Sequence, residues 1–401
     1  MPFAVYVLAL AVFAQGMSEF MLSGLVPDIA DELSVSIPAA GSLTSAFAIG
    51  MVVGAPVVAI LSLRWPRRNA LLTFLVIFLV MHVIGALTDS FEILMVTRVV
   101  AALANAGFLA VGLASAAAMA GPNLKGKATS ILLSGVTLAC IAGVPAGAFI
   151  SELWGWRSAF WAVAILSVPP VFAILRAVPS TAPDPGAPSA LSELRALRNP
   201  RLLVVLVLGA LVNGATFCSF TYLALVVTDV AHLSSSWVPL ALLLFGLGSF
   251  AGVNIGGRFG DSKPLQLLGF GAVALLAGWL LFALTSGNAV VAFVFMFIQG
   301  TLSFAVGSTL IGQVFYLATG APTLAGGFAT SALNVGAAAG PALGGIAIGA
   351  GLGFRSPLLV SATMVAVALL VGGVALLASR SKAAAATAEE GAPSSEQTPA
   401  V

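Results

Sequence analysis

The chain has 401 residues, of which 60% are hydrophobic and only 7% are charged, and its formal net charge is +2. Soluble domains carry roughly 25% charged residues, and the mean hydropathy of this chain is +1.11, so the composition excludes a soluble globular protein. The small net charge gives no indication of nucleic-acid binding. Cys140 and Cys218 lie within apolar stretches, and they indicate neither a disulfide framework nor a metal site.

Apolar stretches long enough to cross a bilayer, which takes about 20 residues of helix, recur along the whole chain. In order, the twelve stretches cover residues 3–26, 39–62, 69–88, 92–119, 128–150, 158–178, 202–227, 237–257, 264–285, 289–312, 325–350 and 357–378. The first has no basic residue before it and is too long for the core of a signal peptide, so we expect it to be retained. The sequence therefore predicts an all-α polytopic membrane protein with twelve transmembrane helices.

Basic residues are divided unevenly between the two sets of loops. One set holds only two, Arg157 and Arg355. The other set holds thirteen: Arg64, Arg67, Arg68, Lys125, Lys127, Arg176, Arg195, Arg198, Arg201, Arg258, Lys263, Arg380 and Lys382. Because loops rich in Lys and Arg stay in the cytoplasm, we expect both termini there, in a multi-pass protein of the cytoplasmic membrane.

A stretch rich in Pro, Ala and Ser, residues 179–200, divides the spans six and six. We predict an N-terminal half at 1–178, a cytoplasmic linker at 179–200, a C-terminal half at 201–378 and a disordered cytoplasmic tail at 379–401. Short motifs recur about 200 residues apart, as when Trp154-Gly155-Trp156-Arg157-Ser158 is matched by Leu352-Gly353-Phe354-Arg355-Ser356. Parallel repeats of this kind are typical of secondary transporters, whose substrate site lies between the halves near the membrane midplane.

Apart from Glu92 and Arg176, which lie at the ends of their stretches, Glu19 and Arg98 are the only formal charges inside the long apolar stretches. At 1.5 Å per residue, both are expected roughly 10 Å below the outer end of their helices, and therefore at matching depth. A charge at bilayer depth costs a few kcal/mol and usually faces the bundle interior, pairs with another charge or marks an ion path. The two residues are our leading candidates for function.

Several short motifs flank the spans. Arg64-Trp65-Pro66-Arg67-Arg68 follows the second span, Gly257-Arg258-Phe259-Gly260-Asp261 ends the eighth, and Gly143, Pro145 and Gly147 lie in the fifth. Together with Arg98 they resemble motifs of the major facilitator superfamily, in particular its twelve-span drug:proton antiporters, although Leu63 stands where the first loop motif usually has Asp. The resemblance implies two parallel six-helix halves. It also implies conformational gating by Arg67, Arg68, Gly143, Pro145, Gly147, Arg258 and Asp261. We expect Gly340 and Pro341 to take part as well, because small residues let helices slide and Pro bends a helix, although tight static packing is the alternative.

Three further segments, residues 15–20, 213–222 and 334–341, resemble the actinobacterial chloramphenicol-resistance exporters, and the likeness runs from Pro2 to about Ala378. One departure is Leu225, where such exporters often have Pro. The resemblance implies proton-driven efflux of chloramphenicol and related phenicols, which confers resistance. A proton-coupled exporter of another small molecule and an uptake symporter stay open as alternatives, because the fold runs in either direction.

An enzyme is not expected, because the sequence has no acid pair on one helix, no His cluster, no Gly-x-Ser-x-Gly turn and no Walker-type loop. We expect no cofactor and no metal. The expected partners are a small-molecule substrate, protons and the lipid bilayer, and we expect a monomer.

For coupling, we predict that Glu19 takes a proton from outside and that Arg98 sets how readily Glu19 releases it. Burial favours the neutral form of a carboxyl group, whereas a nearby guanidinium favours the charged form. The alternative is a permanent buried ion pair that only holds the first and fourth spans together, although such a pair is weak evidence for stability.

A cavity for an uncharged aromatic drug needs mostly apolar walls and a few polar groups. The candidates for substrate binding are Phe20, Asn105, Phe108, Asn213, Phe217, Phe220, Tyr222, Gln299, Phe304 and Asn334. For the polar residues, the alternative is hydrogen bonding between helices, and for the phenylalanines it is packing. His82, in the third span, is expected to have a structural role.

Overall fold

The computed structural model describes residues 2–62, 65–120, 125–179, 194–260, 262–318 and 325–390, and these are helical, without strands. Twelve of the helical segments are long and apolar enough to cross a membrane, as the sequence predicts. In lipid, a helix satisfies all backbone hydrogen bonds within one segment, which is why apolar spans adopt this form. The first half contains α1 (Phe3–Phe20), α2 (Val26–Glu32), α3 (Ile37–Ser62), α4 (Arg67–Leu87), α5 (Phe91–Ala120), α6 (Lys125–Leu138), α7 (Val144–Trp154) and α8 (Arg157–Ala177).

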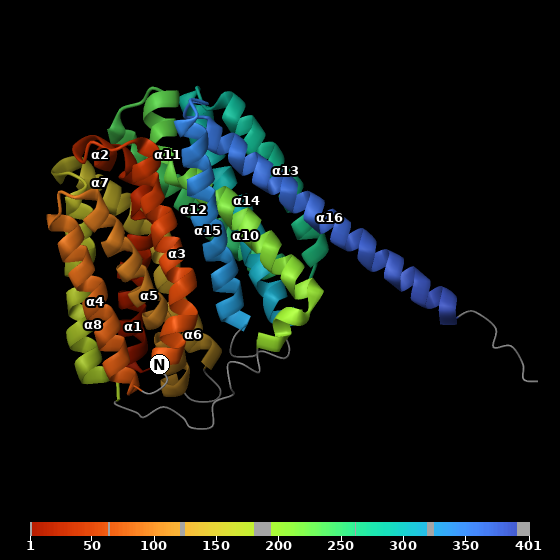
Figure 1. Cartoon of the computed structure of the whole chain (residues 1–401), viewed down its shortest axis with the longest axis horizontal. Coiled ribbons are helices and arrows are strands. Elements are labelled where there is room, and N and C mark those ends of the chain that lie inside the picture. Colours follow the sequence, from red (N-terminus) through yellow and green to blue (C-terminus); the bar gives the residue numbers. More distant parts are fainter. Residues whose placement is uncertain are drawn as a thin grey trace, which may run out of the picture.

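The second half begins after a short 3₁₀ segment, Leu194–Arg198. Its helices are α10 (Pro200–Thr221), α11 (Leu223–Leu225), α12 (Val238–Phe259), α13 (Pro264–Thr285), α14 (Ala289–Leu317), α15 (Ala325–Gly349) and α16 (Ser356–Glu390). Figure 1 shows α1 to α8 on one side of the bundle and α10 to α16 on the other. Asn199 caps α10 by accepting a hydrogen bond from the Arg201 amide, and Pro200 occupies the first helical position, where no amide donor is needed.

The last helix extends beyond the predicted end of the twelfth span at residue 378. α16 continues to Glu390, into the part predicted to be a disordered tail. The run Lys382-Ala383-Ala384-Ala385-Ala386 explains this difference, because alanine has the highest helix propensity of all residues. Residues 391–401 and most of the predicted linker, 180–193, lie outside the described residues.

The span predicted at 128–150 is divided in the structure. A π-helical turn, Ala139–Gly143, joins α6 to α7. Pro145 lacks an amide hydrogen and cannot donate to the carbonyl group of Ile141, so the regular hydrogen-bond pattern is interrupted here. Turns of this kind often occur at functional sites.

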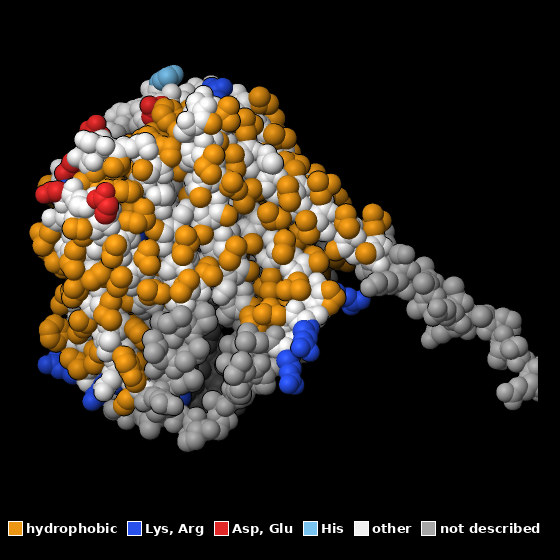
Figure 2. Space-filling view, viewed as in Figure 1, with side chains coloured by type: hydrophobic (Ala, Val, Ile, Leu, Met, Phe, Trp, Pro, Cys, Tyr) orange, Lys and Arg blue, Asp and Glu red, His pale blue; other side chains and the backbone are white. Residues whose placement is uncertain are grey.

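Charged side chains distinguish the two ends of the bundle. Figure 2 shows the Asp and Glu side chains gathered at one end and most of the Lys and Arg side chains at the other, where the N-terminus also lies in Figure 1. We name these the acidic end and the basic end. At the acidic end, Arg157 pairs with Glu32 and with Asp89, and it also donates to the Thr88 carbonyl, so it joins α2, α8 and the connection between α4 and α5.

The two halves meet in the part of the bundle nearer the acidic end. Ser45 on α3 donates to the Ala338 carbonyl on α15 over 2.7 Å, and Ser235 donates to Glu152 over 2.8 Å. At Gly246 on α12, the backbone comes so close to the π turn that a methyl group there would lie 2.6 Å from the Cys140 carbonyl oxygen.

Nearer the basic end, the same helix faces are not covered. Ile49 follows Ser45 by one turn on α3 and is 52% exposed, and Val335 precedes Ala338 by about one turn on α15 and is 49% exposed. Residues one turn apart share a helix face, so the contact between α3 and α15 does not extend over these two side chains. The contacts between the halves named here thus lie towards the acidic end.

Candidate transport site

Glu19 lies in the last turn of α1, where the regular helix gives way to a 3₁₀ turn at Met21–Gly24. The side chain of Glu19 is half-buried. Glu19 is close enough to Arg98 and to Cys140 to interact electrostatically with both. Within the described part of the chain it forms no ion pair, since the pairs there are those of Arg157. The permanent Glu19–Arg98 ion pair, which the sequence left open, is thus not present in this conformation.

Arg98 is held by the residue next to Glu19. Its guanidinium group donates to the Ser18 hydroxyl over 2.8 Å and to the Ser18 carbonyl over 2.9 Å, and it lies 4.4 Å from the centre of the Phe47 ring. The side chain is 1% exposed. An aromatic face and the negative end of a helix dipole both stabilise a cation, so the end of α1 and Phe47 replace the ion pair that a buried arginine would otherwise need.

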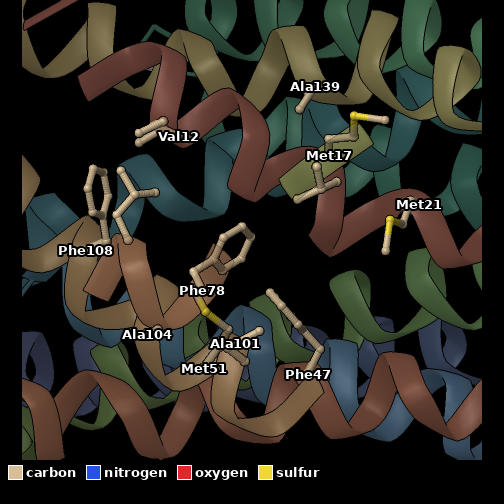
Figure 3. Packing of buried hydrophobic residues seen from close by; sticks show 14 of the residues in the cluster. Val12, Met17, Met21, Phe47, Met51, Phe78, Ala101, Ala104, Phe108 and Ala139 are labelled. Carbon is tan, nitrogen blue, oxygen red and sulfur yellow. The ribbon is translucent and has the colours of Figure 1, made fainter. Parts of the chain in front are cut away.

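His82 completes this arrangement from α4. Its Nε2 lies 2.6 Å from the Ser18 hydroxyl, and its Nδ1 lies 2.7 Å from the Phe78 carbonyl. The ring also packs on Phe78 and Phe160, with centroids 4.2 Å and 5.9 Å away. Figure 3 shows the apolar surroundings, with Phe47 and Phe78 beside Ala101 of α5. Sequence reasoning gave Ser18 no role and His82 only a structural one.

Four predicted phenylalanines meet where the halves join. Phe20 of α1 lies with its ring centroid 5.6 Å from that of Phe217 and 6.5 Å from that of Phe220. Phe245 of α12, which sequence reasoning missed, lies 4.7 Å from Phe220 and 6.3 Å from Phe304. We call these five residues the aromatic cluster; it is contributed by both halves, and Phe20 directly follows Glu19 in the chain.

Of the phenylalanines predicted to bind substrate, Phe108 is the one that lies outside the aromatic cluster. It is fully buried inside the N-terminal half, where Figure 3 shows it near Val12. Gln299 is also fully buried, with its amide 3.4 Å from the Leu275 carbonyl and packed against Gly278, so it faces α13 rather than the N-terminal half.

The other polar candidates hold helices together in this conformation. Asn213 on α10 donates to the Leu333 carbonyl of α15 over 2.7 Å. Tyr222, which directly follows α10, donates to the Pro341 carbonyl of α15 over 2.9 Å. Asn334 donates to Thr330 of its own helix.

Several buried polar side chains of the N-terminal half have polar atoms without a hydrogen-bond partner, and two of them carry amide groups. Asn105, on α5, is 1% exposed, and its carbonyl oxygen has no partner. Gln15, on α1, which sequence reasoning passed over, is also 1% exposed with both amide atoms unpaired. Buried groups of this kind mark places where water or a ligand can bind.

With this geometry established, comparison with known proteins identifies the family. The model of the Major Facilitator Superfamily matches residues 8–326. The chain belongs to this superfamily. A relative, the "Chloramphenicol resistance protein" of Streptomyces lividans, is 54% identical over 92% of this chain and 95% of its own length. The "Inner membrane transport protein YdhP" of Escherichia coli K12 is 33% identical over 91% of this chain and 93% of its own.

Solved structures of the superfamily share the fold. A bacterial homologue of the human lysosomal transporter Spinster, in an inward-facing and occupied conformation, has a TM-score of 0.73 and 17% identity, covering 94% of this chain and 96% of that one. A mutant form of the nucleoside transporter NupG has a TM-score of 0.74 and 13% identity, covering 92% and 98%. At such low sequence identity, the two structures show a shared fold and nothing about substrate. The family and the relatives make this protein a multi-pass membrane transporter rather than an enzyme.

The described gating residues that were predicted lie at the basic end and within the spans. Arg67 and Arg68 are half-buried at the start of α4, and Arg258 is exposed at the end of α12, whereas Asp261 lies outside the described residues. Gly143 and Gly147 pack against Met17 of α1. Gly340 touches the Gly214 backbone of α10 so closely that any side chain would collide with it. Pro145 begins α7 and Pro341 lies inside α15. Their gating roles stay predictions.

Proposed function

We propose that this transporter exports chloramphenicol and related phenicols from the cytoplasm in exchange for protons and thereby confers resistance. The observation that carries the proposal is the relative named for chloramphenicol resistance, which is 54% identical along 92% of the chain. The matched region covers 92% of this chain and therefore extends over both halves.

The chemistry of the site supports this substrate class. A phenicol is uncharged and aromatic and has hydroxyl and amide groups, which suits a mostly apolar site with a few polar groups. The rings of the aromatic cluster pack on one another in this conformation, and they would contact a drug that binds where the halves join; aromatic pairs contribute about 0.5–1.5 kcal/mol beyond their buried area. Asn213 is half-buried beside this region on the same helix as Phe217.

The orientation in the membrane follows from charge. By the positive-inside rule we place the basic end, and with it both termini, in the cytoplasm of a bacterial cell. In the proposed export the drug would enter between the halves from the cytoplasm, and Glu19, which is half-buried, would exchange its proton there.

The energetics are sufficient for resistance. One proton that moves inward across 100 mV provides about 2.3 kcal/mol, which sustains roughly a fifty-fold gradient of a neutral drug. Arg98, a buried charge next to this site, would set how readily Glu19 releases its proton.

The test is accumulation of labelled chloramphenicol in energised cells that express the chain, its Glu19→Gln variant or an empty vector, with and without a protonophore. We expect lower accumulation with the intact chain only, and no effect of the chain once the protonophore is added. Glu92→Gln is the matched control, since Glu92 is an exposed acid on α5. If Glu19→Gln still lowers accumulation, Glu19 does not carry the proton; if the intact chain equals the vector, the substrate is another small molecule or the flux is inward.

A further inference from the structure

The three buried side chains Arg98, Ser18 and His82 form a chain of hydrogen bonds with a defined direction. The Phe78 carbonyl can only accept, so His82 Nδ1 must carry the hydrogen of the 2.7 Å bond. In a neutral imidazole, Nε2 then accepts, and its partner at 2.6 Å, the Ser18 hydroxyl, donates. This tautomer is inferred from the hydrogen-bond partners.

The Ser18 hydroxyl is thereby fixed in one orientation. Its hydrogen points to His82, and its lone pairs point to Arg98, which can only donate and does so over 2.8 Å. The second Arg98 nitrogen binds the Ser18 carbonyl at the end of α1. One residue thus holds both arms of the guanidinium group, and His82 sets the direction in which the hydroxyl of that residue points.

The consequence concerns the neighbouring Glu19. Arg98 interacts with it electrostatically, yet the two form no ion pair within the described residues. The ionisable groups that face Glu19 from the surrounding elements are Arg98 on α5 and Cys140 in the π turn, and His82 lies behind Arg98 on α4. A guanidinium that is free to turn would pair with this carboxylate, because the carboxylate carries the opposite charge and can accept two parallel hydrogen bonds, whereas the Ser18 oxygens are neutral.

We propose that Ser18 and His82 are positioning residues that hold Arg98 on the C-terminal end of α1, so that the Glu19 carboxylate stays unpaired and can take up a proton. This inference rests on the proton exchange proposed above. His82 neither carries the proton nor touches substrate in this scheme. It acts through Ser18.

The structure supplies variants that separate positioning from packing. His82→Phe keeps a ring against Phe78 and Phe160 but removes the acceptor for the Ser18 hydroxyl, whereas His82→Gln keeps an acceptor and removes the ring. Positioning predicts that His82→Phe changes proton uptake and that His82→Gln changes it less; a packing role predicts the opposite order. Ser18→Ala removes the hydroxyl, and Ser18→Thr retains it as the control.

The readout is the pH dependence of labelling by dicyclohexylcarbodiimide, which reacts with protonated carboxyl groups, on the purified full-length protein with Glu19→Gln as the blank. A guanidinium that moves into contact shifts a carboxyl titration by about 1 to 3 pH units. We therefore expect the labelling midpoint to fall by about 1 pH unit or more in Ser18→Ala and His82→Phe, with a matching shift of the transport profile to lower pH.

Equal midpoints in the wild type, Ser18→Ala and His82→Phe would overturn the inference, as would a larger shift in His82→Gln than in His82→Phe. Labelling does not require a drug, so this result is independent of the substrate. A Glu19→Gln variant that still exports would instead refute the proposed coupling. If His82→Phe fails to fold, the Ser18→Ala and Ser18→Thr pair decides the question alone.

Discussion

The contact between Gly246 and the π turn predicts how a single methyl group would redistribute the conformations of this transporter. A Cβ atom at Gly246 would lie 2.6 Å from the Cys140 carbonyl oxygen and 2.9 Å from the Ile141 Cα atom, well inside ordinary contact distance. These atoms belong to opposite halves. The collision in Gly246→Ala therefore arises only while the acidic end is closed, and it is relieved when the halves separate there.

The magnitude follows from the cost of overpacking, which is typically about 1–3 kcal/mol. At 1.4 kcal/mol per tenfold change, Gly246→Ala should shift the equilibrium away from the closed acidic end by roughly 5- to 150-fold. Gly257→Ala is the matched control, because it lies on the same helix and a Cβ atom there meets nothing within 4 Å. Both variants gain the same helix propensity of about 1 kcal/mol, so this term cancels.

The assay uses the bond between Ser235 and Glu152, which joins the halves at the acidic end over 2.8 Å. Cysteines introduced at both positions should form a disulfide rapidly under mild oxidation, and Cys140 and Cys218 are buried. We expect the rate to fall at least several-fold when Gly246→Ala is added and to remain unchanged with Gly257→Ala. Equal rates in both backgrounds would show that this contact does not hold the acidic end closed.

Three other variants test separate parts of the structure. Tyr222→Phe removes the buried bond to the Pro341 carbonyl and should lower the free energy of unfolding by about 1–2 kcal/mol, measured by thermal melting in detergent; an unchanged midpoint would contradict this. Phe217→Ala removes a ring between Phe20 and Phe220 and should raise the drug concentration for half-maximal export severalfold, whereas Phe270→Ala, at an exposed site on α13, should not. Partial burial, together with the negative charges of Glu152 and Asp31, raises the pKa of Asp28.

The sign of the Asp28 effect is definite. A carboxyl group whose pKa is higher in the folded state favours folding most below its ordinary pKa, and this contribution is lost as the pH rises through the folded value. Asp28→Asn should therefore raise the melting temperature at pH 7, with a difference that shrinks towards acid pH. A variant less stable than wild type at pH 7 would contradict this electrostatic account.

The spans, and the common level of Glu19 and Arg98 along the bundle, could be predicted from the sequence because the bilayer imposes the length and form of each span. An apolar run of about 20 residues must be a helix, and a helix rises by a fixed amount per residue. Arg98 accordingly binds the residue next to Glu19, as matching depth requires. The same rules account for the twelve spans that the helices of the two halves form.

Helix rotation could not be predicted in the same way. Lipid and protein interior are equally apolar, so a span such as α13 carries almost no pattern that marks its inner face. Gln299 faces α13, and Phe108 lies inside the N-terminal half, although both were selected with residues of the aromatic cluster. Ser18 and His82 were missed for a related reason, since a hydroxyl and an imidazole become a network only when helices far apart in the chain meet.

The position of Arg98 connects this network to the conformational change. Arg98 is stabilised by the end of α1, and α1 ends where it does because a 3₁₀ turn begins at Met21. The last residue of that helix, Phe20, belongs to the aromatic cluster between the halves. Any movement of the C-terminal half that displaces Phe20 must therefore also move Glu19 and the Ser18 carbonyl relative to Arg98. The same short segment carries the proposed proton site, the support of the buried cation and a contact across the halves, which is the arrangement that coupling requires.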